Sequence, residues 1–357
     1  MTTLDPDFAA RDARRAAMFA RITKAEPVLS AVGLGFVTPI LRAIAGDNPR
    51  GQLGQIWRLA GVPLLSITVF LTLWATFAPM VQTSLGSIPG PAAVWAEAVT
   101  LHQDAADKAA KEADFVAQLA ERNARMIAEG RPDDVRDMAY TGAPSYYDQI
   151  WTSIKTVFFG FVIASAIAIP LGILAGLSPT ANAALNPLIQ IFKPVSPLAW
   201  LPVVTMVVSA AYATNDGFFA KSFLTSAINV TLCSLWPTLI NTAMGVASID
   251  KDLVNVSKVL KMGVWTKITK LVLPSALPLI FTGLRLSLGV GWMVLIAAEM
   301  LAQNPGLDKF VWDEFQNGSS QSLARIMVAG FTIGLIGFAF DRLMYAIQAA
   351  YTYTNNR

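Results

Sequence analysis

Long apolar runs are the feature that most limits what this chain can fold into. An α-helix of about 20 apolar residues matches the hydrocarbon core of a bilayer, and several runs reach roughly that length. Lipid offers no partner for backbone N–H and C=O groups, so each run is expected to be helical. Hydrophobic residues make up 54% of the chain and charged residues only 14%. The sequence therefore predicts an all-α integral membrane protein with six transmembrane helices.

One of the predicted spans is broken by proline. The spans are residues 59–79, 154–177, 188–209, 223–246, 277–301 and 326–347. The third contains Pro194, Pro197 and Pro202, and irregular backbone at membrane depth is tolerated only inside protein or along a water-filled cavity. It is therefore the first candidate for lining a translocation path. The pairs Gly172/Gly176 and Gly330/Gly334 are expected to let helices pack closely.

The remaining segments are assigned from their charge. Residues 1–58 are predicted to form an Arg-rich amphipathic arm and, over 27–44, an interfacial elbow helix, with an additional span as the alternative. Residues 80–150 are rich in acids and form a predicted helical insertion, either a solvated spacer or a docking surface. Residues 151–347 form a five-helix core, and 348–357 a tail. Lysine and arginine gather in the arm and in the loop 247–274, so the positive-inside rule places both termini and this loop in the cytoplasm and the insertion outside.

The loop 247–274 is polar, rich in lysine and held between two spans. Ser248 or Asp250 is expected to cap a first short helix, on which Leu253, Val256 and Leu260 form one apolar stripe. Gly263 is expected to end this helix. Two interpretations of this loop stay open: it is a connector that lies on the membrane surface, or it is a surface that a soluble partner binds.

The chain lacks the motifs of an enzyme. It has no Gly-rich phosphate loop and no HExxH motif, and its single histidine, His102, lies in a polar segment. No metal site and no nucleic-acid partner are expected. A secondary anion transporter driven by an ion gradient is the alternative of another class. Such a carrier typically shows two similar halves and acids in mid-membrane, whereas this chain has only Glu299 near a span end.

The loop resembles the cytoplasmic coupling motif of ABC importer permeases. That motif reads Glu-Ala-Ala, three residues, Gly, nine residues and Ile-x-Leu-Pro. This chain keeps the spacing, but Asn255, Val256 and Ser257 replace Glu-Ala-Ala and Lys261 replaces Gly, before Leu271, Leu273 and Pro274. By this resemblance the residues expected to couple to an ATPase are Asp250, Leu253, Asn255, Val256, Ser257, Leu260, Lys261, Gly263 and Pro274.

Further segments are similar to the branch of these permeases for nitrate, nitrite, cyanate, bicarbonate, taurine and sulfonates, and most of all to its nitrate type. They are SPLAWLP (196–202) and the stretches 236–256, 273–292 and 297–301. The resemblance implies a type I importer fold in the bacterial inner membrane and a homodimer of permease subunits. It also implies two cytoplasmic ATPase subunits, which hold the ATP and magnesium, and an extracytoplasmic solute-binding protein. No cofactor is expected in this chain.

Two cations within the predicted spans are candidates for an anion path. Lys193 lies in the broken span and Arg285 near the middle of the fifth, and a cation at such depth costs several kcal/mol unless it pairs or faces water. A structural alternative for Arg285 is snorkelling or pairing, although Glu299 lies fourteen positions along the same helix, too far for direct contact. Further candidates for the path are Ser196, Trp200, Ser209 and Glu299.

Overall fold

The computed structural model describes residues 16–23, 25–26, 29, 33–46, 49–83, 86–212, 219–319 and 321–354. Its regular secondary structure is helical except for a two-stranded ribbon of β1 (Gln82–Thr83) and β2 (Gly86–Ser87). Five helices are long and apolar enough to cross a membrane, and a bent helix pair makes a sixth span if it is counted as one. The predicted all-α membrane fold is confirmed.

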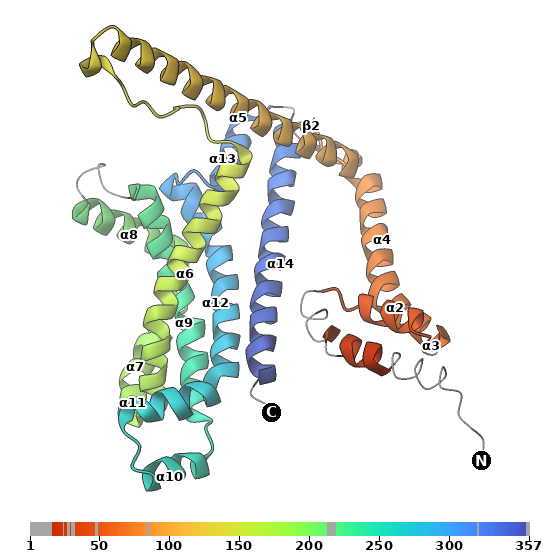
Figure 1. The fold of residues 1–357 in the computed structure, drawn as a ribbon, viewed down its shortest axis with the longest axis vertical. Coiled ribbons are helices and arrows are strands. Elements are labelled where there is room, and N and C mark those ends of the chain that lie inside the picture. Colours follow the sequence, from red (N-terminus) through yellow and green to blue (C-terminus); the bar gives the residue numbers. More distant parts are fainter. Residues whose placement is uncertain are drawn as a thin grey trace.

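Three spans form the core of the molecule (Figure 1): α6 (Tyr146–Leu177), α9 (Lys221–Ala247) and α12 (Leu273–Ala302). Their backbones approach closely because small residues lie at the crossings. A Cβ added at Gly172 or Gly176 of α6 would overlap side chains of α9, so the predicted close packing there is confirmed. No described helix of this chain packs against Gly330 or Gly334, so for them close packing stays a prediction.

A serine of α12 joins two backbone groups of α9 beside Pro237, which lies inside that helix. The Thr238 N–H donates to Ser287 Oγ at 3.1 Å, and the Ser287 hydroxyl donates to the Ser234 carbonyl at 2.5 Å. In a regular helix this N–H and this carbonyl bond each other directly. Ser287 and Thr238 are fully buried, so the hydroxyl satisfies polar groups that water does not reach.

The proline-rich span is broken, as predicted. Helices α7 (Pro179–Phe192) and α8 (Pro197–Ala211) meet at an angle of 101°. Ser196 caps the second helix, since its hydroxyl accepts a hydrogen bond from the Leu198 N–H. Both α8 and α7 run beside the core, with Phe192 stacked on Trp236 of α9.

The N-terminal part lies to one side of the core. It comprises α2 (Val37–Ile44), α3 (Pro49–Ile56), the π-helical turn Trp57–Gly61 and α4 (Val62–Phe77), which ends in a 3-10 turn, Ala78–Met80. Figure 1 shows α4 diverging from α14 (Ser322–Thr354). The two helices meet near the end of α4, where the ring of Trp74 lies 5.2 Å from that of Phe331, and none of the residues in the apolar window of α4 is buried. The predicted elbow over 27–44 lies partly outside the described residues, and its described part contains α2.

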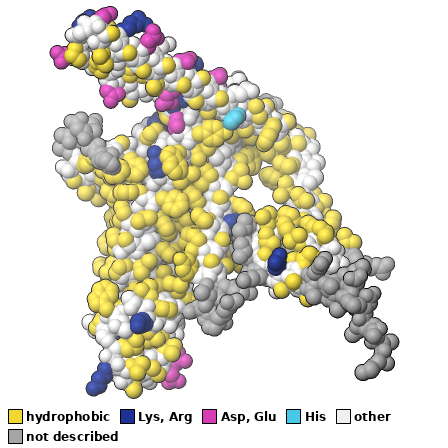
Figure 2. All heavy atoms as spheres, in the orientation of Figure 1, with side chains coloured by type: hydrophobic (Ala, Val, Ile, Leu, Met, Phe, Trp, Pro, Cys, Tyr) yellow, Lys and Arg dark blue, Asp and Glu magenta, His cyan; other side chains and the backbone are white. Residues whose placement is uncertain are grey.

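The two ends of the bundle carry different elements. At one end lie the C-terminus, α10 (Lys251–Val259), α11 (Val264–Lys267) and the π-helical turn Ile268–Val272 (Figure 1). At the other lie α13 (Leu307–Asn317) and the insertion, formed by α5 (Pro91–Ala128) and the 3-10 turn Pro132–Asp134. Figure 2 shows apolar side chains over the middle and charged side chains gathered at both ends.

Candidate functional sites

Helix α10 is the centre of the coupling loop, residues 247–274. Asp250 caps it, since its carboxylate accepts a hydrogen bond from the Asp252 N–H at 2.9 Å. Ser257 is buried, and its hydroxyl donates to the Val254 carbonyl at 2.6 Å. The loop therefore has a defined conformation of its own.

The two long faces of α10 have opposite chemistry. The side chains of Leu253, Val256 and Leu260 are 46%, 53% and 66% exposed, so the apolar stripe has no cover within the described chain. Lys251 and Lys258 lie on the opposite face, seven positions apart, and line a cavity that also touches the ends of α6 and α9. The apolar face points away from the body and the basic face toward it.

Helix α10 ends two residues earlier than the sequence suggested. Its C-cap is Leu260, and Lys261 follows in the left-handed conformation with φ of +48°. Glycine adopts this conformation without steric cost, which explains physically why the coupling motif has glycine at this position. Gly263 does not end α10 but precedes the first turn of α11.

The coupling loop is joined to the fifth span without a break. A single helical segment runs from Val264 to Ala302 through the π-helical turn, and Pro274 lies in the first turn of α12. The helix therefore begins before residue 277, where the membrane span is predicted to start. A force on the second half of the loop reaches the membrane through continuous helix.

Arg285 of α12 has a partner that the sequence reasoning missed. It makes a two-pronged ion pair with Asp341 of α14, from Nε to Oδ1 at 2.5 Å and from Nη2 to Oδ2 at 3.0 Å. Arg342 also donates to Asp341 Oδ2, at 2.8 Å. Two guanidinium groups thus share one carboxylate, which leaves a net positive charge. In the sequence, the signal for this partner was an aspartate, Asp341, inside the last apolar run.

This ion cluster borders open space at depth. The side chains of Arg285 and Asp341 are 33% and 36% exposed and line a cavity of about 610 Å³ with Thr282, Tyr345 and Gln348. Arg285 lies about 18 Å along α12 from its first residue, at 1.5 Å per residue. Exposing a charged cluster to lipid acyl chains at such depth costs free energy. The open side of the cluster is therefore expected to face protein or water.

The candidates on the broken span lie elsewhere. Lys193 is exposed at the end of α7, at the bend, whereas Arg285 lies between α12 and α14. Trp200 is half-buried, with its ring 5.7 Å from that of Phe192, and Ser209 is exposed near the end of α8. The structure does not bring these residues together with Arg285.

Glu299 lies in a closed polar cluster at the far end of α12. Its carboxylate accepts hydrogen bonds from the Ser153 hydroxyl at 2.6 Å and from Asn304 Nδ2 at 3.2 Å. The side chain is fully buried, and a Cβ at Gly306 would overlap it. Beside it, burial raises the pKa of Asp308 to about 7. Glu299 therefore joins α12 to α6 and α13 in this conformation and faces no open path.

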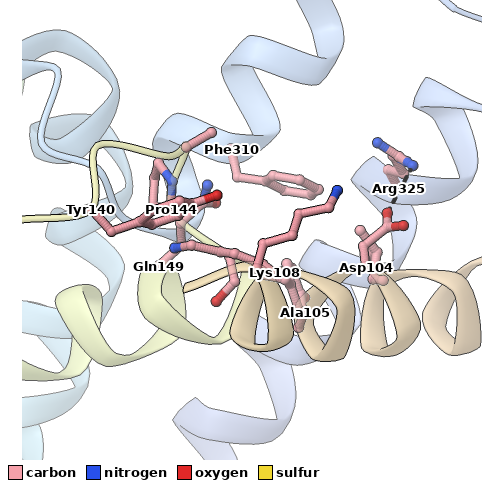
Figure 3. A pocket seen from close by; sticks show the side chains of 13 residues that line it. Asp104, Ala105, Lys108, Tyr140, Pro144, Gln149, Phe310 and Arg325 are labelled. Atoms are coloured by element: carbon pink, nitrogen blue, oxygen red, sulfur yellow. Dashed lines mark ion pairs between the residues drawn. The ribbon is translucent and has the colours of Figure 1, made fainter. Parts of the chain in front are cut away.

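A third cavity, of about 270 Å³, lies at the root of the insertion (Figure 3). Arg325 of α14 pairs there with Glu97 at 2.8 Å, Glu314 at 3.3 Å and Asp104 at 3.5 Å. Lys108 of α5 pairs with Asp148 of α6 at 2.6 Å. These contacts fix the first part of α5 to the core. Among the described residues no group of three His, Cys, Asp or Glu side chains is placed to hold a metal ion.

Comparison with known proteins gives a consistent picture. The family model described as binding-protein-dependent transport system inner membrane component matches residues 168–353. The nitrate import permease protein NrtB of Synechococcus elongatus is 36% identical over 55% of this chain and 66% of its own length. The bicarbonate transport system permease protein CmpB of the same organism is 32% identical over 85% of this chain and 94% of its own length.

Another relative is a putative ABC transporter permease protein of Methanocaldococcus jannaschii, 34% identical over 59% of this chain and 74% of its own length. A solved structure titled as the MetNI methionine ABC transporter aligns with 57% of this chain and 95% of its own, at 16% identity and a TM-score of 0.46. The family match includes the broken span, the coupling loop and the Arg285–Asp341 pair, while the insertion lies outside it. The chain therefore belongs to the family of inner membrane components of binding-protein-dependent transport systems, as a multi-pass permease subunit rather than an enzyme.

Proposed function

We propose that this chain is the transmembrane permease subunit of an ATP-driven importer for a small inorganic anion. Nitrate is the first candidate for this anion and bicarbonate is the second. It works as a pair of identical subunits with two cytoplasmic ATPase subunits, which bind ATP and magnesium, and with an extracytoplasmic solute-binding protein. Both termini and the coupling loop are cytoplasmic, and the insertion is extracytoplasmic. Relatives named for nitrate and for bicarbonate support this substrate class.

The observation that carries the proposal is the uncovered apolar stripe on α10. Leu253, Val256 and Leu260 are held on a capped helix, at the end of the bundle and on the face away from it. Covering three such side chains contributes a few kcal/mol to an interface. Because the loop continues into α12, a partner that moves α10 also moves the span that carries Arg285.

The charged cluster supports an anion as cargo. Arg285, Arg342 and Asp341 together carry a positive charge at a depth where lipid is a poor neighbour. A water-lined face of this kind attracts a monovalent anion, while the shared aspartate limits how tightly the anion is held. A second permease subunit against this face is the other way to shield the cluster.

The coupling surface is tested by Leu253→Asp in the assembled complex. The variant is expected to lose ATPase subunits on co-purification, because a carboxylate replaces an apolar anchor, while the membrane subunit keeps its unfolding midpoint. Val116→Asp is the matched control, since Val116 is an exposed valine of the insertion, at the opposite end of the molecule. Full retention of the ATPases by Leu253→Asp would contradict the proposed coupling.

The cargo is tested with the complete complex in proteoliposomes. Nitrate, nitrite, bicarbonate, cyanate and taurine are compared for stimulation of ATP hydrolysis in the presence of the solute-binding protein. Nitrate is expected to stimulate most. The secondary-transporter alternative predicts uptake driven by an ion gradient through the permease chain alone, and such uptake would overturn the proposal.

A further inference from the structure

A cavity of about 360 Å³ lies behind the coupling helix, between α10 and the ends of two spans. Lys251 and Lys258 of α10 and Lys267 of α11 line it, together with the amide of Asn255. Leu177, the last residue of α6, and Val246, near the end of α9, provide apolar wall. Three separate lysines thus border one open groove, in which Lys251 and Lys258 are exposed and Lys267 is half-buried.

No carboxylate offsets these charges. The cavity lining contains no aspartate or glutamate, and within the described part of the chain the lysines in ion pairs are Lys108 and Lys309, both at the other end of the molecule. Two acids flank Lys251 in sequence: Asp250 is used as the cap of α10, and Asp252 does not line the cavity. Three ammonium groups around one cavity repel one another unless an anion enters.

The ends of the helices do not supply that negative charge. A helix C-terminus carries roughly half a negative charge, and an N-terminus roughly half a positive charge. The C-terminus of α6 is followed directly by the N-terminus of α7, and that of α9 by the N-terminus of α10. The positive end of each following helix therefore offsets part of the negative charge of the preceding one, and the lysines remain the main charges at the cavity.

We propose that this cavity binds a phosphate-class oxyanion, either inorganic phosphate or the phosphate of an anionic lipid headgroup. Ammonium and amide groups donate hydrogen bonds to oxygen, and the space exceeds the roughly 30 Å³ that one water occupies by about tenfold, enough for a phosphate with water around it. The proposal rests on the proposed function only in placing the loop on the cytoplasmic side.

The departure of this chain from the coupling motif fits such a site. Asn255 stands where the motif has glutamate, and its side chain lines the cavity. A glutamate there would bring a negative charge to the lysines, whereas asparagine leaves that charge to a ligand. A bound oxyanion touching Lys258 and Lys267 ties α10 to α11, and through α11 to the fifth span.

The test uses the full-length chain in a neutral detergent, with the thermal unfolding midpoint as the readout. Sodium phosphate is titrated against sodium chloride at matched ionic strength. Phosphate is expected to raise the midpoint of the unsubstituted chain, and Lys258→Gln and Lys267→Gln are each expected to need about tenfold more phosphate for the same rise, because one charge-assisted contact is lost. Lys270→Gln is the matched control, since Lys270 belongs to the same loop but does not line the cavity.

A second arm separates the two sources of phosphate. In nanodiscs, phosphatidylglycerol is compared with phosphatidylcholine for the unsubstituted chain and for the same variants. Stabilisation by phosphatidylglycerol that depends on Lys258 and Lys267 identifies a lipid, and stabilisation by free phosphate alone identifies the inorganic ion. The proposal is overturned if neither probe stabilises the chain, or if Lys270→Gln weakens the response as much as the cavity variants. No ATPase or transport enters this readout, so its failure is distinct from failure of the importer proposal.

Discussion

Replacing Ser287 by alanine tests how the core spans are held together. The Ser287 hydroxyl donates to the Ser234 carbonyl and accepts from the Thr238 N–H, and its oxygen lies 2.7 Å from the Thr238 hydroxyl. Ser287→Ala removes this common partner from groups that are fully buried between α9 and α12. The volume change is one oxygen atom, so lost hydrogen bonds dominate the effect.

The expected destabilisation follows from the number of bonds lost. Interhelical hydrogen bonds in membranes average about 0.6 kcal/mol, which for three bonds gives about 2 kcal/mol. A buried polar group left without any partner costs about 1–3 kcal/mol, which raises the upper estimate to about 4 kcal/mol. We therefore expect Ser287→Ala to lower the free energy of unfolding by about 2–4 kcal/mol.

The assay is reversible unfolding in mixed micelles, followed by tryptophan fluorescence as the denaturing detergent is increased. Ser165→Ala is the matched control, because the Ser165 hydroxyl of α6 is buried without a hydrogen-bond partner among the described residues. Its loss is expected to leave stability unchanged or to raise it, because a buried hydroxyl without a partner is itself unfavourable. Equal stability of the two variants would refute the reasoning that the hydroxyl joins α9 to α12.

Three further predictions follow from the sites. Lys261→Gly is expected to raise the thermal midpoint by the equivalent of about 1 kcal/mol, since glycine removes the cost of a left-handed residue; an unchanged or lowered midpoint would count against it. The folded-state pKa of Asp308, about 7, lies above its ordinary value, so between pH 4 and 7 the folded protein binds a proton that the unfolded chain does not. The free energy of unfolding therefore falls as pH rises through this range. Asp308→Asn should flatten the profile of unfolding midpoint against pH. The double variant Arg285→Gln, Asp341→Asn is expected to keep the unfolding midpoint of the unsubstituted chain but to lose anion-stimulated ATP hydrolysis. Unimpaired hydrolysis would show that the ion pair has only a structural role.

The sequence predicted the spans well because bilayer thickness sets their length. The broken span followed from its prolines, and the structure bends there by 101°. The predicted ends were less accurate, since polar extensions continue two spans as helix: the fifth begins at Val264, and the last, α14, runs to Thr354. Hydrophobicity marks where a helix enters lipid and not where its hydrogen bonding stops.

The partners of the candidate site residues were harder to predict. Arg285 was singled out from its depth, but its partner Asp341 lies 56 positions away in sequence, and only the packing of α12 against α14 joins them. Glu299 looked like an isolated acid near a span end, and the structure surrounds it with residues from α6 and the loop before α13. Lys261 was visible as a departure from glycine, although its positive φ requires the backbone to be known.

Because the insertion is fixed to the core at one end, a small rotation of the core produces a larger displacement at the tip of the insertion. Arg325 and its carboxylates tie α5 to α14 near Asp104, and from Asp104 to Ala128 the helix continues for about 36 Å at 1.5 Å per residue. The returning segment stays alongside, with Asn123 bonded to the Arg136 backbone in both directions. A turn of α14 by about 10° would then displace the tip by about 6 Å, from the same rise per residue. A spin or fluorescent label near residue 128 would therefore read out, from outside the membrane, a rearrangement too small to resolve at the spans themselves.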